Sequence, residues 1–266
     1  MKQDEIQKII LELIPTFLKA GEESIDLFNK KLKINTKDDN TPVTNGDLAV
    51  NEMIIEKLKN ISPNIEIVSE ENIGDVETKE RKDLWLIDPI DGTNSYINGG
   101  DEYTLNAGLV INKKAVAGII YAPKKNRLFF SYGTNNAYEI KNNKKIKIDC
   151  QKLNDKTIAL SNSSSPSDKI MRILDNYKVV KFKSMRSSLK FCLIANGEFD
   201  LYAANPRAKE WDIAAGHAIA ENAGAIVSTH NNEPIRYGKS DFSNPSLLVR
   251  KLSLIHISEP TRPNNI

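Results

Sequence analysis

One segment of the chain reads Leu84-Trp85-Leu86-Ile87-Asp88-Pro89-Ile90-Asp91-Gly92-Thr93 and joins an apolar run directly to two aspartates. The apolar run predicts a buried strand. Two carboxylates at its end would be desolvated and would repel each other unless a cation joined them. Magnesium, which takes oxygen ligands, is the simplest such cation. Gly92 allows a close backbone approach to a ligand, and the N–H groups after it can hold a phosphate. An Asx turn is the alternative for this segment taken alone.

The sequence on both sides of this segment predicts an α+β first half. Apolar residues at helical spacing indicate a helix over 4–29, with a kink or break at Pro15 or Gly21, and a second helix over 44–59. Apolar and β-branched runs predict a series of strands at 65–68, 84–87, 103–111, 115–121, 128–132 and 137–140. The lysine-rich stretch 141–147 is interpreted as solvated surface.

Beyond about residue 150 strands and helices alternate, which indicates an α/β second half. Strands are expected at 157–161, 178–182 and 199–203, and helices at 168–175, 188–196 and 212–223. The chain therefore divides into an N-terminal half, 1–150, that carries most of the metal ligands and a C-terminal half, 151–252. The segment 253–266 has no clear period and resembles a translated sequencing adaptor, so we expect it to be a non-native tail.

Composition excludes several classes of partner. The chain has 266 residues, with 37 Lys and Arg against 35 Asp and Glu, and this even balance argues against binding a nucleic acid polymer. No apolar stretch approaches the length of about 20 residues that a transmembrane helix needs. The two cysteines, Cys150 and Cys192, lie far apart, which favours a reducing compartment. We expect a cytoplasmic protein, with peripheral association at the inner membrane left open.

Three further acids strengthen the interpretation of a metal site. Glu70 follows a predicted strand, Asp47 lies in the first turns of a predicted helix, and Asp212 opens another helix directly after Trp211. Each has an ordinary alternative, since Asp212 alone is typical of a helix N-cap and Glu70 alone of surface charge. Glu71, beside Glu70, remains ambiguous. The three acids together with Asp88 and Asp91 indicate metal-dependent chemistry.

These motifs resemble the inositol monophosphatase superfamily of magnesium-dependent, lithium-sensitive sugar phosphatases. The resemblance covers residues 5–250 and rests on Ser69-Glu70-Glu71, on the Asp-Pro-x-Asp-Gly-Thr motif at 88–93 and on the Trp-Asp-x-Ala-Ala-Gly motif at 211–216. Thr41 to Thr44, Glu102 to Asn106, Ser187 to Cys192 and Glu210 to Asp212 are most similar to the bacterial CysQ-type 3′(2′),5′-bisphosphate nucleotidases. The sequence departs from that branch at 100–104 and at Asn205-Pro206-Arg207, which affects substrate selection.

The resemblance implies a layered α/β/α/β/α fold with two mixed-sheet halves, and it implies roles for individual residues. Two or three Mg²⁺ ions are expected. Their implied ligands are Glu70, Asp88, the Ile90 carbonyl, Asp91 and Asp212. The catalytic residues are Asp47, Glu70 and Thr93, with Thr93 hydrogen-bonded to Asp47 to orient the attacking water. The scissile phosphate and the rest of the substrate are expected to contact Glu70, Ile90, Asp91, Gly92, Thr93, Ser187, Ser188, Lys190 and Asp212.

Lys190 or Arg186 is a candidate partner for a second phosphate of a nucleotide. The alternative is that Lys190 is an ordinary solvated helix residue.

The predicted activity is hydrolysis of adenosine 3′,5′-bisphosphate to AMP and phosphate by water attack. Inositol monophosphate and fructose 1,6-bisphosphate remain alternative substrates for the same chemistry. A non-catalytic phosphate-binding regulator is the alternative from another class, and it is disfavoured because Glu70, Asp88, Asp91, Thr93 and Asp212 are all present. The chain is expected to be a monomer or a homodimer.

Overall fold

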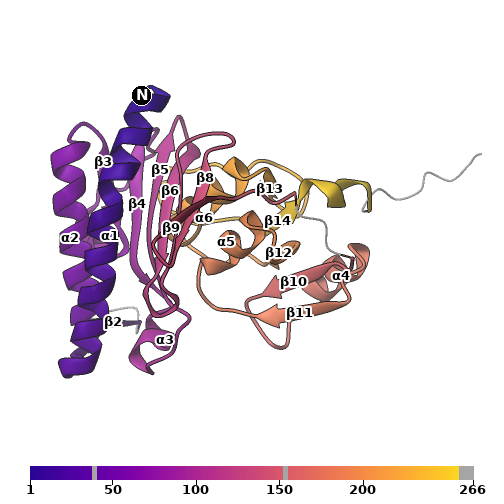
Figure 1. The fold of residues 1–266 in the computed structure, drawn as a ribbon, viewed down its shortest axis with the longest axis horizontal. Coiled ribbons are helices and arrows are strands. Elements are labelled where there is room, and N and C mark those ends of the chain that lie inside the picture. Colours follow the sequence, from indigo (N-terminus) through magenta and orange to yellow (C-terminus); the bar gives the residue numbers. More distant parts are fainter. Residues whose placement is uncertain (38–40, 152–154, 258–266) are drawn as a thin grey trace, which may run out of the picture.

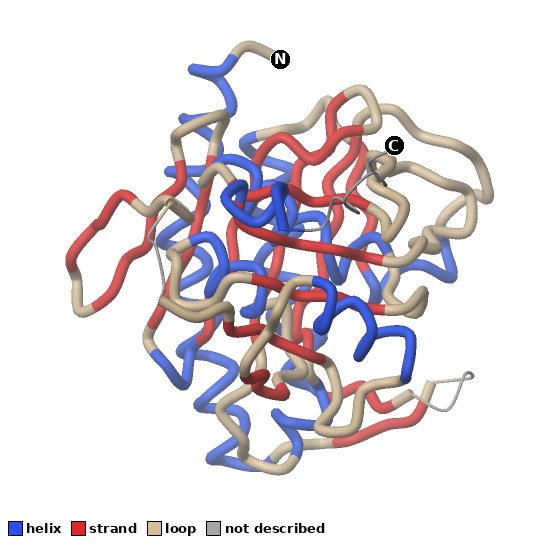
Figure 2. Tube along the Cα trace, turned by 90° about the vertical axis from the view of Figure 1, so that its right-hand side faces the viewer, coloured by secondary structure: helices blue, strands red, loops and turns tan. Residues whose placement is uncertain are grey.

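The computed structural model describes residues 1–37, 41–151 and 155–257. Five layers follow one another across the molecule (Figure 1): helices α1 and α2, a seven-stranded sheet, helices α5 and α6, a five-stranded sheet, and α4. Figure 2, viewed from the side of α4, shows that helix in front of strands of the smaller sheet. This is the layered arrangement of helices and two mixed sheets that the sequence predicts.

The outer layer consists of α1 (Gln3–Lys31) and α2 (Asn45–Ile61). Helix α1 continues through Pro15 and Gly21, so the expected break is absent from this described helix. Its fully buried residues Ile10, Leu13 and Phe17 face the larger sheet. A short antiparallel pair that the sequence does not predict, β1 (Ile34–Thr36) and β2 (Pro42–Thr44), precedes α2.

The larger sheet has the strand order β3-β4-β5-β6-β7-β8-β9. Strands β3 and β4 run parallel, and all the other neighbours are antiparallel. Its strands are β3 (Glu66–Ser69), β4 (Leu84–Asp91), β5 (Thr104–Ile111), β6 (Lys114–Ala122), β7 (Arg127–Ser131), β8 (Ala137–Lys141) and β9 (Lys144–Lys147). Strand β9 falls in the stretch 141–147, where all four of its residues are exposed, as expected for solvated lysines, although the stretch is a strand.

The smaller sheet has the order β11-β10-β12-β14-β13 and is also mixed. Its strands are β10 (Ile158–Ser161), β11 (Lys181–Ser184), β12 (Leu201–Ala204), β13 (Ala225–Ser228) and β14 (Leu247–Lys251). The helices of this half are α4 (Asp168–Asn176), α5 (Leu189–Ala195) and α6 (Glu210–Asn222). The sequence did not predict β13 and β14, and β11 begins three residues later than expected.

Helix α6 packs directly on the larger sheet because two glycines there leave room for it. A Cβ atom at Gly118 would lie 2.4 Å from the Ala215 carbonyl oxygen, and one at Gly108 would lie 2.6 Å from the Ala215 nitrogen. The same hydrophobic cluster contains Leu86 of the first half and Ile219 of α6. The two sheets therefore share one hydrophobic cluster, and the division of the chain into 1–150 and 151–252 stays a prediction.

The expected non-native tail lies partly within the described residues. A 3-10 helix spans Leu252–Ile257, and Leu254 is buried against the cluster around α4. Residues 258–266 lie outside the described residues. The origin of the segment 253–266 stays a prediction.

Candidate active site

The end of β4 places Asp88 and Asp91 at the centre of the site. The pairing of β4 with β5 shifts register between these two aspartates, which marks a bulge. Gly92 follows with φ of +93°, and a Cβ atom there would lie 2.6 Å from the Glu102 carbonyl oxygen. Only glycine fits this turn without strain. The short helix α3 (Thr93–Ile97) begins directly after it.

Glu70 and Asp212 reach Asp88 from two other elements. Glu70 begins the 3-10 helix Glu70–Asp75 directly after β3, and since β3 is parallel to β4 both strands end at the same edge of the sheet. Asp212 lies in the first turn of α6, where its side chain accepts a hydrogen bond of 2.7 Å from the Lys209 N–H. One carboxylate oxygen each of Glu70, Asp88 and Asp212 lie within 4.8 Å of one another.

The carboxylates carry the electrostatic signature of a group that needs a cation. Burial, followed by the charges of Glu70, Asp91 and Asp212, raises the pKa of Asp88 well above its usual range. Burial and the charges of Asp91 and Glu70 raise the pKa of Asp212 to about 8. The Oδ1 atom of Asp88 is buried and has no hydrogen-bond partner among the described residues. An all-oxygen donor set with an unsatisfied buried oxygen fits a hard divalent cation such as Mg²⁺.

Asp91 faces the C-terminal half instead. Its Oδ2 atom accepts a hydrogen bond from the Ser188 N–H, and the positive charge of Lys190 acts on it. Lys190 is 3% exposed, so its interpretation as a solvated helix residue is wrong. Its Nζ donates to the Ser187 carbonyl at 2.6 Å and lies 5.1 Å from the centre of the Tyr202 ring. Burial lowers the pKa of Lys190 to about 8, against the opposing charge of Asp91.

The two serines differ in what they offer to a substrate. The hydroxyl of Ser188 donates to Asn106 Oδ1 at 2.8 Å and lies 2.8 Å from the Thr104 hydroxyl, so it is already engaged. The Ser187 hydroxyl is buried and has no hydrogen-bond partner among the described residues. Ser188 lines a hollow of the site, whereas Ser187 is completely buried and lines neither of the two hollows described below.

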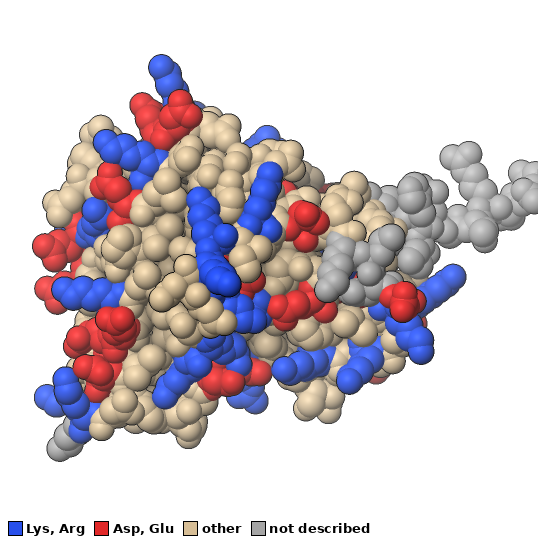
Figure 3. Space-filling view, viewed as in Figure 1, with Lys and Arg blue, Asp and Glu red and all other residues tan. Residues whose placement is uncertain are grey.

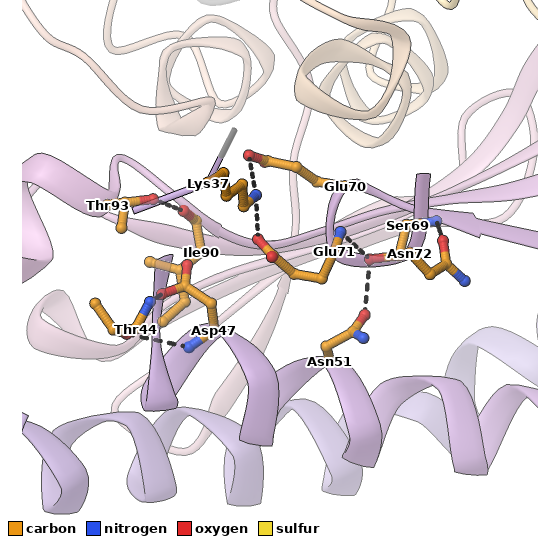
Figure 4. Close-up of polar contacts among 10 residues, drawn as sticks. All are labelled: Lys37, Thr44, Asp47, Asn51, Ser69, Glu70, Glu71, Asn72, Ile90 and Thr93. Atoms are coloured by element: carbon orange, nitrogen blue, oxygen red, sulfur yellow. Dashed lines mark hydrogen bonds and ion pairs between the residues drawn. The ribbon is translucent and has the colours of Figure 1, made fainter. Parts of the chain in front are cut away.

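Thr93 and Asp47 adopt contacts that differ from the expected pair (Figure 4). The Thr93 hydroxyl donates to the Ile90 carbonyl at 3.0 Å, in place of the expected hydrogen bond to Asp47. Asp47 accepts through Oδ2 from the N–H of Thr44 at 2.8 Å and from its hydroxyl at 2.6 Å, which caps α2. Burial raises the pKa of Asp47 in spite of these hydrogen bonds. Asp47 is therefore held rigidly by its own helix.

Lys37 is a residue of the site that the sequence did not predict (Figure 4). It follows β1, and its Nζ lies 3.1 Å from Glu70 Oε1 and 2.8 Å from Glu71 Oε1. Although burial opposes it, the hydrogen bond to Glu71 and the charge of Glu70 raise the pKa of Lys37. The ambiguous Glu71 thus has a role, since it binds this lysine. The sequence around Lys37 carries only polar residues and gave no signal of a site.

The site opens into two hollows that share a wall. A cleft of about 550 Å³ runs over the carboxylates and is bordered by Thr41, Gly92 and Thr93 on one side. A narrower side cavity of about 80 Å³ enters the C-terminal half. Both are lined by Asp91, Asn162, Arg186, Arg207 and Asp212. Elsewhere acidic and basic side chains are interspersed over the face in Figure 3, in keeping with the net charge of +2.

The family model for the inositol monophosphatase family matches residues 3–257. The chain therefore belongs to this family of metal-dependent phosphatases. It is 37% identical over 224 residues to the 3′(2′),5′-bisphosphate nucleotidase CysQ of Buchnera aphidicola, a match that covers 83% of this chain and 84% of the relative. It is 31% identical over 234 residues to CysQ of Escherichia coli K12, covering 86% of this chain and 94% of the relative.

A solved structure gives the same result for the fold. The crystal structure of CysQ from Bacteroides thetaiotaomicron, a bacterial member of the inositol monophosphatase family, superimposes with a TM-score of 0.78 at 32% identity. The superposition covers 92% of this chain and 97% of that one. The resemblance inferred from the motifs and the fold that it implies are confirmed. Among the described residues, no helix is both long enough and apolar enough to cross a membrane.

Proposed function

We propose that this chain is a magnesium-dependent 3′(2′),5′-bisphosphate nucleotidase that hydrolyses adenosine 3′,5′-bisphosphate to AMP and phosphate. The observation that carries the proposal is the convergence of Glu70, Asp88 and Asp212 within 4.8 Å, with a buried oxygen of Asp88 left unsatisfied. The names of the similar relatives support a nucleotide that bears two phosphates. Phosphate monoesters react very slowly in water, so charge neutralisation and positioning are what the site must supply.

The carboxylates Glu70, Asp88, Asp91 and Asp212, together with the Ile90 carbonyl, would hold two or three Mg²⁺ ions. When bound, Mg²⁺ neutralises charge on the phosphate and lowers the pKa of water. Ile90 lines the cleft, and its carbonyl, which accepts a hydrogen bond from the Thr93 hydroxyl, has two lone pairs.

The side chains around the carboxylates would orient the reactants. Both hydrogen bonds to Asp47 go to Oδ2, so Oδ1 is the oxygen that accepts from the Thr93 hydroxyl in the substrate complex, where that hydroxyl turns away from the Ile90 carbonyl to which it donates here. Thr93, held by Asp47 and aided by Glu70, then directs the attacking water in line with the scissile bond. The backbone N–H groups at Gly92 and Thr93 hold the phosphate, because the left-handed Gly92 brings the main chain to the cleft.

A panel of phosphate esters tests the proposal. Phosphate release is measured for adenosine 3′,5′-bisphosphate, inositol 1-phosphate and fructose 1,6-bisphosphate, with and without Mg²⁺ and over a lithium titration. The bisphosphate nucleotide should give the highest kcat/KM, only with Mg²⁺, and lithium should inhibit. A tenfold preference for inositol 1-phosphate or fructose bisphosphate would exclude the nucleotidase assignment. No turnover of any ester would favour the non-catalytic regulator.

The proposal includes a cytoplasmic location and a monomeric or homodimeric state. Cys150 and Cys192 are both free and buried, which supports a reducing compartment. Light scattering on the purified chain measures the oligomeric state directly.

A further inference from the structure

We propose that Tyr96 is a positioning residue for the reaction, because it fixes helix α3, which carries Thr93, against helix α2, which carries Asp47. The inference rests on the proposed function, in which Thr93 and Asp47 together orient the attacking water. Tyr96 lies on α3 three residues after Thr93, and residues three apart are neighbours on a helix surface. Its side chain is 1% exposed and does not line the cleft, so Tyr96 acts through these neighbours.

The ring of Tyr96 packs on the bare backbone of Gly46, the residue directly before Asp47 in α2. A Cβ atom at Gly46 would lie 2.5 Å from the Tyr96 Oη atom and 2.8 Å from its Cε1 atom. Any residue larger than glycine would therefore push the ring, and α3 with it, away from α2. This contact sets the position of Thr93 relative to Asp47.

The hydroxyl of Tyr96 joins a third element to the same contact. It donates a buried hydrogen bond of 2.6 Å to the Ser24 carbonyl in α1. Burial raises the pKa of Tyr96, so the hydroxyl remains protonated and keeps its role as a donor. The ring centres of Phe28 and Tyr103 lie 5.9 and 4.9 Å from that of Tyr96 and enclose it on other sides. The hydroxyl thus holds the ring in one place between α1 and α2.

Thr93 needs such an anchor because α3 is short. The helix spans five residues after the left-handed Gly92, and a helix of that length is not stable through its own hydrogen bonds. The Thr93 hydroxyl donates to the Ile90 carbonyl here, and it must turn toward Asp47 in the substrate complex. That rotation brings the two side chains together only if α2 and α3 keep a fixed separation, which Tyr96 provides.

The test compares Tyr96→Phe with Tyr103→Phe, a matched control that removes a second tyrosine hydroxyl from the same cluster. Tyr103 is also 1% exposed, and its hydroxyl lies 3.0 Å from the Ser24 hydroxyl. Tyr96→Phe should lower kcat by about fivefold with little change in KM, because losing one ordinary hydrogen bond changes the population of the competent state by about that factor. Tyr103→Phe should lower the Tm to a similar extent and leave kcat unchanged, with both rates measured far below the Tm.

A double-mutant cycle tests the contact between the two helices. Gly46→Ala should lower kcat, although alanine is the better helix former, because its methyl group meets the Tyr96 ring. In Gly46→Ala/Tyr96→Phe the atom nearest to that methyl group is gone, so the loss should be smaller than the product of the two single losses. If Gly46→Ala does not fold, the two tyrosine variants decide alone.

Three results would overturn the inference: an unchanged kcat in Tyr96→Phe, an equal loss of kcat in Tyr96→Phe and Tyr103→Phe, or a loss in the double variant equal to the product of the single losses. In each case Tyr96 only fills the core.

Amide hydrogen exchange separates this inference from the proposed function, because it requires no turnover. The amides of Ser95 and Tyr96 donate to the Gly92 carbonyl, and they should exchange about fivefold faster in Tyr96→Phe but not in Tyr103→Phe. If the wild type hydrolyses no phosphate ester, the proposed function fails, yet faster exchange in Tyr96→Phe alone still supports the anchoring of α3. Unchanged exchange in Tyr96→Phe contradicts that anchoring at any level of activity.

Discussion

Asp88 lies at the buried end of β4, where the charges of Glu70, Asp91 and Asp212 act on it. Without a cation this arrangement is unfavourable, because burial and mutual repulsion both disfavour the ionised carboxylates. In the absence of a cation, the carboxylates of the candidate metal centre therefore lower the stability of the folded protein, and their role is in function. Substitutions here should separate activity from folding.

Asp91→Asn should abolish phosphate release, by at least about a hundredfold in kcat/KM, while the fold remains intact. Residues that only support metal ligands already cost roughly 10- to 100-fold when changed. The asparagine side chain retains an oxygen that can accept from the Ser188 N–H, so packing is preserved. Steady-state kinetics and thermal melting measure the two effects. Near-normal activity would refute the assignment of Asp91 to the metal centre.

The metal-free protein should lose stability as the pH rises. Asp212 has a pKa of about 8 when folded, against about 3.9 for an unfolded aspartate. Between these values the folded state binds more protons than the unfolded state, so the contribution of Asp212 to stability is fully present below pH about 4 and is lost as the pH approaches 8. In EDTA the Tm of the wild type should fall relative to Asp212→Asn between pH 5 and 8. Parallel Tm curves would contradict the prediction.

At the scale of elements, a helix terminus positions a catalytic group. Thr44 is the N-cap of α2, and the same residue donates two hydrogen bonds to Asp47 in the first turn. Capping and positioning therefore depend on one hydroxyl. This contact follows from the Thr-x-x-Asp spacing of a capping box, which the sequence displays.

Thr44→Val should destabilise the protein by about 1 kcal/mol, the usual value of an N-cap. It should also reduce kcat more than it changes KM, because Asp47 loses the one of its two hydrogen bonds from Thr44 that the hydroxyl donates. Thr44→Ser retains the hydroxyl and is the matched control. Denaturant unfolding and kinetics on both variants give the comparison. If the free energy of unfolding and kcat fell as far in Thr44→Ser as in Thr44→Val, the hydroxyl would not be the relevant group.

Most elements predicted correctly have a strong apolar pattern, although the buried strands β13 and β14 were missed. The apolar run Leu84 to Ile87 forms a strand, as predicted, and all four of its residues are buried. Asp88, which follows this run, lies close to Glu70 and Asp212. Strands β1 and β9 escaped prediction because every residue in them is exposed, so they carry no alternation.

The contacts missed at the site come from residues in loops. Lys37 and Asn244 follow polar stretches, and only the packing of distant segments brings them to the cleft and the cavity. Lys190 lies on the short helix α5, in which every residue is buried. Such a helix has no exposed face, so the spacing of its apolar residues does not indicate whether Lys190 is buried. Tertiary packing, which sequence periodicity does not describe, determines these positions.

At the scale of the whole molecule, helix α6 connects the two sheets. Gly108 and Gly118 allow its backbone to touch the larger sheet, and its residue Asp212 joins Asp88 at the metal centre. The alignment of the carboxylates thus depends on a close contact at Ala215, less than one helical turn away from Asp212.

Gly118→Ala should destabilise the protein by about 1–3 kcal/mol, since a Cβ atom would lie 2.4 Å from the Ala215 carbonyl oxygen. Because α6 must move to make room, kcat should fall together with the Tm. Gly74→Ala is the control, since a Cβ atom there has nothing within 4 Å. Calorimetry should show one cooperative transition for both sheets, shifted to lower temperature only in Gly118→Ala. Two separate transitions would contradict a shared core.

Asp88 lies in β4 of the larger sheet, Glu70 directly after β3, and Asp212 on the helix between the two sheets, and this arrangement has a consequence for the lifetime of the protein. A cation bound to all three carboxylates would link the larger sheet to helix α6. Such a cation stabilises the folded chain by about 2.7 kcal/mol when its concentration is a hundred times its Kd. Cells with little magnesium would then contain fewer molecules of the enzyme as well as slower ones, because unfolded chains are continuously degraded.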